Sequence, residues 1–240
     1  PTISDSKTNL GESLGSASAI GAYAALVDGL IANNTYYVRA YAVNEFGTSY
    51  GEPIQFTAVE ATQPLGSGTS ADPYRVETLE NLYWISKNSS SWASVFVQTA
   101  NIDASVSVSW DAGLGFPPIG SSYPYFTGTY DGRNYEISNL IINIPNKYYC
   151  GLFGNTSNAT IRNVVLKDVN VKAPRYLGAL VGNAMKSTIS NCSASGTVSA
   201  PTVSGSLYCG GLIGFSGDGC TISNCQSAVN VNGYQNVGGF

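Results

Sequence analysis

Short runs of alternating apolar and polar residues fill the second half of the chain. In one of them the apolar positions are Val164, Leu166, Val169 and Val171, and similar runs follow later. A period of two indicates strands with one buried face. The runs are too short, and contain too much glycine, serine and asparagine, to be helices. The pattern therefore predicts an all-β region of many short strands.

These runs belong to a unit that is repeated four times between residues 137 and 240. Each unit opens with isoleucine, then serine or arginine, then asparagine, and the openings at 137, 161, 189 and 222 recur after 24, 28 and 33 residues. Repeats of about 20 to 50 residues are typical of solenoids, in which each unit buries its apolar face against its neighbours. Stacking predicts a structural ladder with a column of isoleucines and a column of asparagines: Ile137, Ile161, Ile189 and Ile222, and Asn139, Asn163, Asn191 and Asn224.

Two of the five cysteines follow the ladder asparagine in adjacent units. Cys192 and Cys225 are therefore expected to be stacked neighbours that point into the core. Two interpretations remain open: small buried apolar residues, or a disulfide, because stacked strands lie within the Cα separation that a disulfide spans. A zinc site is not expected, since the chain has no histidine and Cys220 and Cys225 should face different directions. We expect no metal and no cofactor.

Three closing phrases resemble the GLUG repeats of bacterial cell-surface and secreted proteins: Gly-Leu-Phe-Gly, Ala-Leu-Val-Gly and Gly-Leu-Ile-Gly. The resemblance covers residues 126–240, where four copies agree in both halves of the unit. It implies a right-handed parallel β-helix over residues 72–240 that is clearest from residue 126. It implies less about function, since such repeats occur in adhesins, in stalks and in non-catalytic regions of surface hydrolases.

Residues 1–58 have a different pattern, with a strand predicted over 35–44, a turn at 45–48 and a partner strand from Ile54. This segment resembles the last third of a fibronectin type III module of the kind found in Bacteroidota surface proteins. The resemblance implies a partial β-sandwich with Tyr37 at its tyrosine corner. Such a partial sandwich would expose an apolar face and an unpaired edge. Either the chain is a fragment of a longer protein, or a neighbouring chain completes residues 1–58 by donor-strand exchange.

A linker is expected over residues 59–71, because the Gly-Ser-Gly-Thr run at 66–69 is typical of flexible chain. A short helix is predicted next, with Leu82, Trp84 and Ile85 on its apolar stripe. We expect this helix to cap the open end of the β-helix core, with Trp84 as a core anchor. Farther on, strands are expected at 95–97 and 106–110, and a surface loop at 113–125.

Composition narrows the functional classes. Only 11% of residues are charged, against about 25% in ordinary soluble proteins. The net charge of −4 argues against a nucleic-acid partner, which requires a basic face. No apolar run is long enough to span a membrane, and no signal peptide is apparent, so any targeting sequence is expected upstream. These features indicate an extracellular or cell-surface protein.

Catalytic residues are not apparent in the sequence. The absence of histidine excludes a serine-histidine triad and a His-based metalloprotease within these residues. The aspartates fall at different phases of the coil, and Asp131 and Asp218 precede glycine, which is typical of turns. We therefore expect no enzyme activity in this chain.

Tyrosine is the residue type that points to a contact surface. Tyr148, Tyr176 and Tyr208 are expected in one column, either as lateral packing or as a surface that contacts glycan or protein. We therefore expect a non-catalytic adhesin, stalk or filament-forming structural subunit that associates with itself or with another surface protein. The alternative is a non-catalytic or carbohydrate-binding portion of a larger secreted enzyme that degrades polysaccharide or protein.

Overall fold

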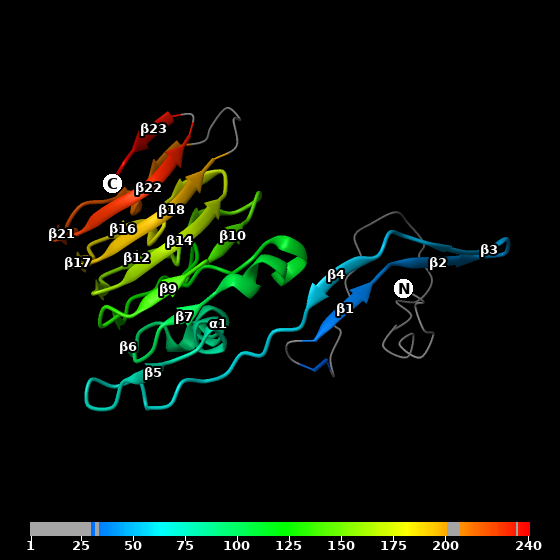
Figure 1. Cartoon of the computed structure of the whole chain (residues 1–240), viewed down its shortest axis with the longest axis horizontal. Helices are drawn as coiled ribbons and strands as arrows, with labels where there is room; N and C mark the ends of the chain where they lie inside the picture. The colour runs from blue at the N-terminus through cyan, green and yellow to red at the C-terminus, as the bar shows by residue number, and fades with distance from the viewer. Residues whose placement is uncertain (1–29, 32–33, 201–206, 234) are drawn as a thin grey trace.

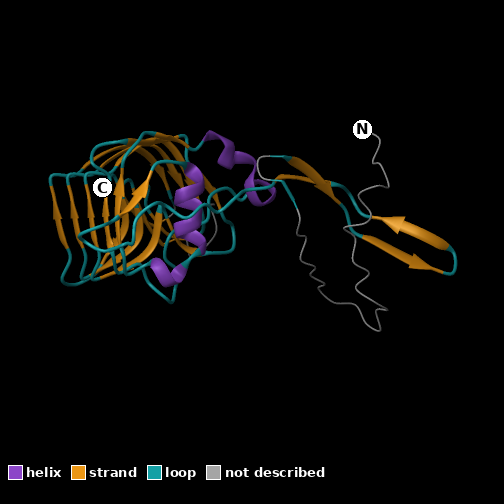
Figure 2. Cartoon of the chain, turned by 90° about the horizontal axis from the view of Figure 1, so that it is seen from below, coloured by secondary structure: helices purple, strands orange, loops and turns teal. Residues whose placement is uncertain are grey.

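The computed structural model describes residues 30–31, 34–200, 207–233 and 235–240, and these form an all-β chain with few helices. Its main feature is a parallel β-solenoid of about 4 turns, in which strands of successive coils lie side by side (Figure 1). Antiparallel strands precede the solenoid in the chain and extend away from it in both views (Figures 1 and 2). Expectations for residues 1–29 lie outside the described residues.

Four parallel sheets form the walls of the solenoid. Sheet 1 contains, in spatial order, β21 (Thr221–Ser223), β17 (Thr188–Ser190), β13 (Thr160–Arg162), β8 (Thr129–Asp131), β6 (Val95–Gln98) and β5 (Tyr74–Val76). Sheet 2 contains β22 (Gln226–Asn232), β18 (Ser193–Ser199), β14 (Val165–Lys172), β9 (Glu136–Ser138) and β7 (Ile102–Asp103), with β10 (Ile141–Asn143) paired to the second half of β14. Sheet 3 contains β11 (Tyr148–Cys150), β15 (Arg175–Leu177), β19 (Leu207–Gly210) and β23 (Gln235–Gly238). Sheet 4 contains β12 (Phe153–Ser157), β16 (Val181–Met185) and β20 (Ile213–Ser216).

The middle residues of β8, β13, β17 and β21 in sheet 1 point into the core. Tyr130, Ile161, Ile189 and Ile222 lie in register on β8, β13, β17 and β21, and the first three are fully buried. Burial of an isoleucine side chain contributes about 1.5–3 kcal/mol. The column therefore supplies much of the energy that holds the coils together.

Ile137 is not part of this column, so that expectation is wrong. It lies in sheet 2, where it pairs with Leu166 and Ile102. The first position in the column belongs to Tyr130, because Thr-Tyr-Asp at 129–131 forms a strand of sheet 1 without matching the Ile-Ser/Arg-Asn phrase. The matching phrase at 137–139 comes one sheet later in the coil.

The predicted cap helix is α1 (Leu79–Lys87), which lies beside the first strands of the stack (Figure 1). Thr78 caps its N-terminus through a reciprocal pair of hydrogen bonds with Asn81. Leu82 and Ile85 are fully buried, whereas Trp84 is half-buried and meets Tyr74 edge to face at 5.5 Å. The deeper anchor comes from outside the helix: after η2 (Ser89–Ser91), the buried indole of Trp92 donates a 2.6 Å hydrogen bond to the carbonyl oxygen of Ile85.

Two expectations for the first coils are wrong. The strand expected at 106–110 is part of η3 (Ser105–Gly113), a 3-10 segment that exposes both valines and buries Trp110. There the buried Ser107 hydroxyl accepts a hydrogen bond from the amide of Ile141, so this polar residue, and not the valines, faces inward. The surface loop expected at 113–125 instead buries Phe116 and Ile119 completely, the first beside β10 of sheet 2 and the second beside β12 of sheet 4.

The hairpin region consists of two antiparallel pairs. β1 (Thr35–Val38) pairs with β4 (Ile54–Thr57), and β2 (Tyr41–Asn44) pairs with β3 (Gly47–Tyr50), so the single strand expected over 35–44 is divided in two. β4 packs against η3, where the hydroxyls of Thr57 and Ser109 lie 3.2 Å apart. A fibronectin-like sandwich is not confirmed by these strands.

Two local expectations in the N-terminal part need correction. Tyr37 is 57% exposed, and the hydroxyl of Tyr36, not that of Tyr37, accepts a hydrogen bond from the upstream amide of Ile31 at 2.9 Å. The 59–71 linker is anchored to the cap, because the amide of Thr62 donates to Glu80 and its carbonyl accepts from Asn81. Leu65 also pairs with Arg75 across an isolated bridge.

Candidate functional site: a tyrosine stack and an asparagine ladder

Three tyrosines on successive strands of sheet 3 form a column along the solenoid. The rings of Tyr149 and Tyr176 stack with centroids 4.9 Å apart, and those of Tyr176 and Tyr208 stack at 5.1 Å. Phe215 of β20 meets Tyr176 and Tyr208 edge to face at 5.9 and 5.1 Å. We call Tyr149, Tyr176 and Tyr208 the tyrosine stack.

The backbone of the stack lies in the left-handed region. The φ angles are 64° at Tyr149, 55° at Tyr176 and 65° at Tyr208, and Asn236 takes the same place in the next coil with φ 49°. This conformation costs about 1–2 kcal/mol for residues other than glycine and asparagine. Aromatic stacking returns about 0.5–1.5 kcal/mol for each pair of rings. Tyrosine is therefore present for contacts made by its side chain, since asparagine satisfies the backbone more cheaply.

The stack contains Tyr149 in place of Tyr148, so the expected column is wrong by one residue in its first coil. Tyr148 pairs instead with Arg175, whose guanidinium lies 5.3 Å from the centre of the Tyr148 ring and 5.8 Å from that of Tyr176. The sequence contains a signal for the correct register. Each stack tyrosine stands two residues before the first glycine of the closing phrase, in a repeated Tyr-x-Gly.

The chemistry of the stack follows from this arrangement. The faces of the three rings are directed at one another, so the stack offers ring edges and phenol hydroxyls to a ligand rather than a flat aromatic platform. None of the three hydroxyls is hydrogen-bonded to another of the described residues. The side chains are half-buried. The stack therefore suits hydrogen bonding along the solenoid better than stacking against sugar rings.

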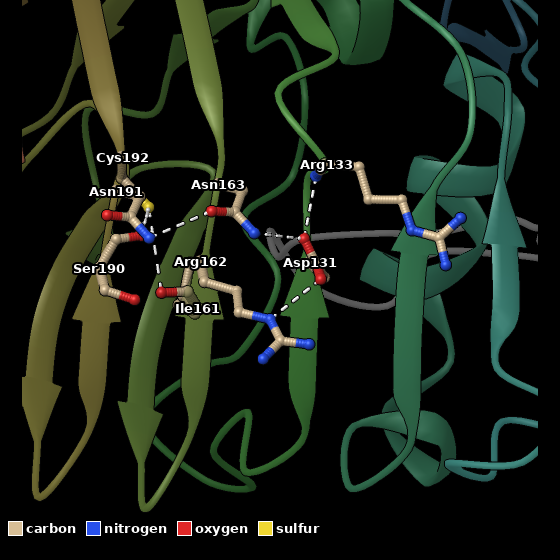
Figure 3. Close-up of polar contacts among 8 residues, drawn as sticks. All are labelled: Asp131, Arg133, Ile161, Arg162, Asn163, Ser190, Asn191 and Cys192. Carbon is tan, nitrogen blue, oxygen red and sulfur yellow. Dashed lines mark hydrogen bonds and ion pairs between the residues drawn. The ribbon is translucent and has the colours of Figure 1, made fainter.

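An asparagine ladder runs along a second corner, beyond the ends of the sheet 1 strands (Figure 3). The amide nitrogen of Asn163 donates to the carboxylate of Asp131 at 2.8 Å, that of Asn191 donates to Asn163 at 3.3 Å, and that of Asn224 donates to Asn191 at 3.3 Å. The three asparagines have φ of 53–54°. Asparagine tolerates this conformation, and its side chain hydrogen-bonds the next coil.

Asn139 was expected in this ladder, and that expectation is wrong for the same reason as for Ile137. Its amide donates to the carboxylate of Asp103 at 3.0 Å, at the corner that follows sheet 2. This hydrogen bond, followed by those from Ser105, lowers the pKa of Asp103. Asp131, which the sequence indicated as a turn residue, begins the ladder instead.

Asp131 is held by several donors at once (Figure 3). It accepts hydrogen bonds from the backbone amide of Arg133 at 3.0 Å and from Nε of Arg162 at 2.9 Å, besides the one from Asn163. Burial raises its pKa, but the hydrogen bonds from Asn163 and Arg133 and the charge of Arg162 outweigh burial, so the pKa is lowered. The residue therefore stays ionised as a structural anchor.

The two cysteines follow the ladder into the core. Cys192 is buried and Cys225 is half-buried, and both are free thiols. Each thiol donates to the carbonyl oxygen two residues earlier, of Ser190 and Ser223, at 3.2 Å. Burial is the main cause that raises the pKa of Cys192, to about 12. As free thiols, the two cysteines contribute to the packing of the core.

Within the part of the chain that the structure describes, no three histidine, cysteine, aspartate or glutamate side chains gather as metal ligands. The helices among the same residues are all too short or too polar to cross a membrane.

The stacked coils define the class of protein: a parallel β-solenoid built from repeated units, with polar and aromatic columns along its axis. Residues 173–199, which include β15 to β18, match the model of the GLUG motif. The motif and the solenoid together support a GLUG-repeat protein.

Two relatives indicate the kind of protein in which such a segment occurs. The chain is 33% identical over 206 residues to halomucin of Haloquadratum walsbyi, a match that covers 83% of the chain and 2% of the relative. It is 34% identical over 122 residues to a Gly-rich membrane protein of Evansella cellulosilytica, which covers 49% of the chain and 14% of the relative. No solved structure matches the chain. The chain therefore spans only a small part of the length of both relatives.

Proposed function

We propose that the chain is a rigid segment of a non-catalytic extracellular surface protein that acts as an adhesin or stalk. The observation that carries this proposal is the in-register stacking of the coils, in which Ile161, Ile189 and Ile222 repeat inside while Asn163, Asn191 and Asn224 repeat at the corner. A solenoid of this kind is stiff along its axis, because neighbouring coils are joined by strand pairing on every side.

The two aspartates with the most hydrogen bonds hold the corners of the coils, which favours a structural rod over an enzyme. Asp131 begins the ladder, and Asp103 binds Asn139 and Ser105 at another corner. The hydroxyls of the tyrosine stack, by contrast, form no hydrogen bond with the other described residues. We therefore propose that the rod presents this stack and its surroundings to a partner.

Antibodies raised against residues 72–240 test the proposal in the organism that produces the protein. We expect them to label intact cells or the culture medium, and mild protease treatment of intact cells to remove the signal. Labelling that requires cell lysis would refute an extracellular role.

A second proposal concerns assembly. The hairpin region exposes apolar side chains, with Val43 66% and Ile54 51% exposed, and the hydrogen bond from Ile31 to Tyr36 is of the tyrosine-corner kind. We propose that residues 1–58 belong to a fibronectin type III-like module that a neighbouring chain completes. Light scattering should then show concentration-dependent oligomers that Ile54→Ser weakens, with Val106→Ser in η3 as the control. A monomer at all concentrations would exclude this assembly.

A further inference from the structure

Arg175 on β15 has unused hydrogen-bonding capacity. Its guanidinium lies between the rings of Tyr148 and Tyr176, at 5.3 and 5.8 Å from their centres. Its Nε is buried without a hydrogen-bond partner, and the guanidinium forms no hydrogen bond or ion pair with any other described residue. A guanidinium carries five donors. None of the five is used by another of the described residues.

Two of the other three arginines of the solenoid and its cap have charged partners, and the third, Arg133, is exposed and lies over no aromatic ring. Arg162 forms an ion pair with Asp131, and Arg75 forms one with Asp72. Arg175 is held by aromatic rings instead, which restrict the side chain without occupying its donors. Restriction before binding lowers the entropic cost of capturing a ligand. The arrangement is that of a pre-positioned anion receptor.

The surroundings are basic and rich in hydroxyl groups. Lys147 directly precedes Tyr148, and Lys172 ends β14 three residues before Arg175. No ion pair links either lysine to a described carboxylate. Tyr148 is 53% exposed, and the hydroxyls of the tyrosine stack continue from Tyr176 along sheet 3.

We propose that Lys147, Tyr148, Arg175 and Tyr176 form a binding site for a polysaccharide that carries carboxylate or sulfate groups. The guanidinium would bind the anion through two parallel hydrogen bonds, as arginine does with carboxylates and related oxyanions. The exposed Tyr148 ring would pack against a sugar ring, and the stack would hydrogen-bond to hydroxyls of the following sugars. Nucleic acid fits less well, because the basic patch is small and the chain has net charge −4.

The proposal deepens the proposed role in surface contact, but its test does not depend on where the protein is located. Binding of the purified chain to immobilised dextran sulfate, polygalacturonate and unmodified dextran should be measured at low and at physiological salt. We expect binding to one or both anionic polymers and none to dextran. Sulfate and carboxylate specificity are distinguished by which polymer binds more tightly.

Arg175→Gln should weaken binding by about tenfold to a hundredfold, since it removes a charge-assisted pair of hydrogen bonds. Arg175→Lys should recover only part of the affinity, because lysine keeps the charge but lacks the planar guanidinium that forms two parallel hydrogen bonds. Arg39→Gln is the matched control, since the Arg39 guanidinium also lies over a tyrosine ring, that of Tyr50 at 3.8 Å, on the distant hairpin. It should bind as the unmodified chain does.

Three results would overturn the proposal. The first is equal binding by the unmodified chain and by a folded Arg175→Gln variant, with circular dichroism as the check of folding. The second is equal binding to dextran and dextran sulfate. The third is tighter binding to polyglutamate than to either anionic polysaccharide, lost in Arg175→Gln, which would assign the site to an acidic protein partner.

Discussion

Replacement of Asn191 by alanine and by glycine separates the two functions of the asparagine ladder. Asn191 is exposed, has φ 53°, donates one amide hydrogen bond to Asn163 and accepts one from Asn224, each at 3.3 Å. Alanine removes both hydrogen bonds and strains the backbone. Glycine removes the same hydrogen bonds and relieves the backbone.

The magnitudes follow from this geometry. Two long, exposed hydrogen bonds are each at the lower end of the usual range, about 0.5 kcal/mol, and alanine adds about 1 kcal/mol for the left-handed conformation. We therefore expect Asn191→Ala to lower the free energy of unfolding by about 2 kcal/mol in total. Asn191→Gly should lower it by about 1 kcal/mol, because the greater freedom of the unfolded chain offsets part of the relief.

Asn170 provides the matched control. It is exposed on β14, forms no side-chain hydrogen bond with the described residues, and is not among the residues with positive φ. In an ordinary strand glycine is worse than alanine by about 0.5–1 kcal/mol. Glycine should therefore be more destabilising than alanine at position 170 and less destabilising than alanine at position 191.

Urea unfolding followed by far-ultraviolet circular dichroism and by tryptophan fluorescence measures these differences. The tryptophans, at 84, 92 and 110, report on the first coils, whereas circular dichroism reports on all strands, so coincident transitions are needed to justify two-state analysis. If alanine and glycine at 191 are equally destabilising, backbone strain plays no part. If both are neutral, the ladder contributes no stability.

Three further predictions concern the other columns. Asp131→Asn should destabilise the chain by about 1–2 kcal/mol at pH 7. Because the pKa of Asp131 is lower in the folded than in the unfolded chain, its carboxylate contributes its full stabilisation above the unfolded pKa and loses it as pH falls through the folded pKa. The unfolding midpoints of the variant and the unmodified chain should therefore converge in acid. Tyr176→Asn removes two stacked pairs, worth about 1–3 kcal/mol, but relieves about 1–2 kcal/mol of backbone cost at φ 55°, so the urea midpoint should fall by the equivalent of only about 1 kcal/mol. Burial raises the pKa of Cys150 and of Cys192 to about 12, so mass mapping after iodoacetamide treatment near pH 8 should show both unlabelled until the chain is unfolded; equal labelling of native and unfolded chain would contradict this.

The sequence was most informative where one coil repeats the next. From the second coil onward, the openings at 161, 189 and 222 lie in register, as their spacing predicts. The repeat did not predict the register of the coil before these, because its core position is occupied by Tyr130 instead of an isoleucine. Ile137 carries the expected letters but lies in sheet 2.

Tertiary contacts explain the other differences. Alternation at 106–110 predicted a strand, but the hydroxyl of Ser107 binds the backbone of Ile141, and Trp110 packs 5.1 Å from Tyr83. The loop at 113–125 has no periodicity because Phe116 and Ile119 enter the core singly. Partners of this kind are distant in the sequence, so local pattern cannot reveal them.

The two corner columns place different residues at left-handed backbone positions. Both corners have left-handed backbone in successive coils, and the ladder places Asn163, Asn191 and Asn224 there, which are suited to it. The other corner meets it with asparagine only at Asn236, and with tyrosine in the three coils before. The backbone cost of tyrosine is about as large as the energy that stacking returns, so fold stability alone does not account for the choice. The remaining reason lies in what the stack and the adjacent Arg175 present to a partner.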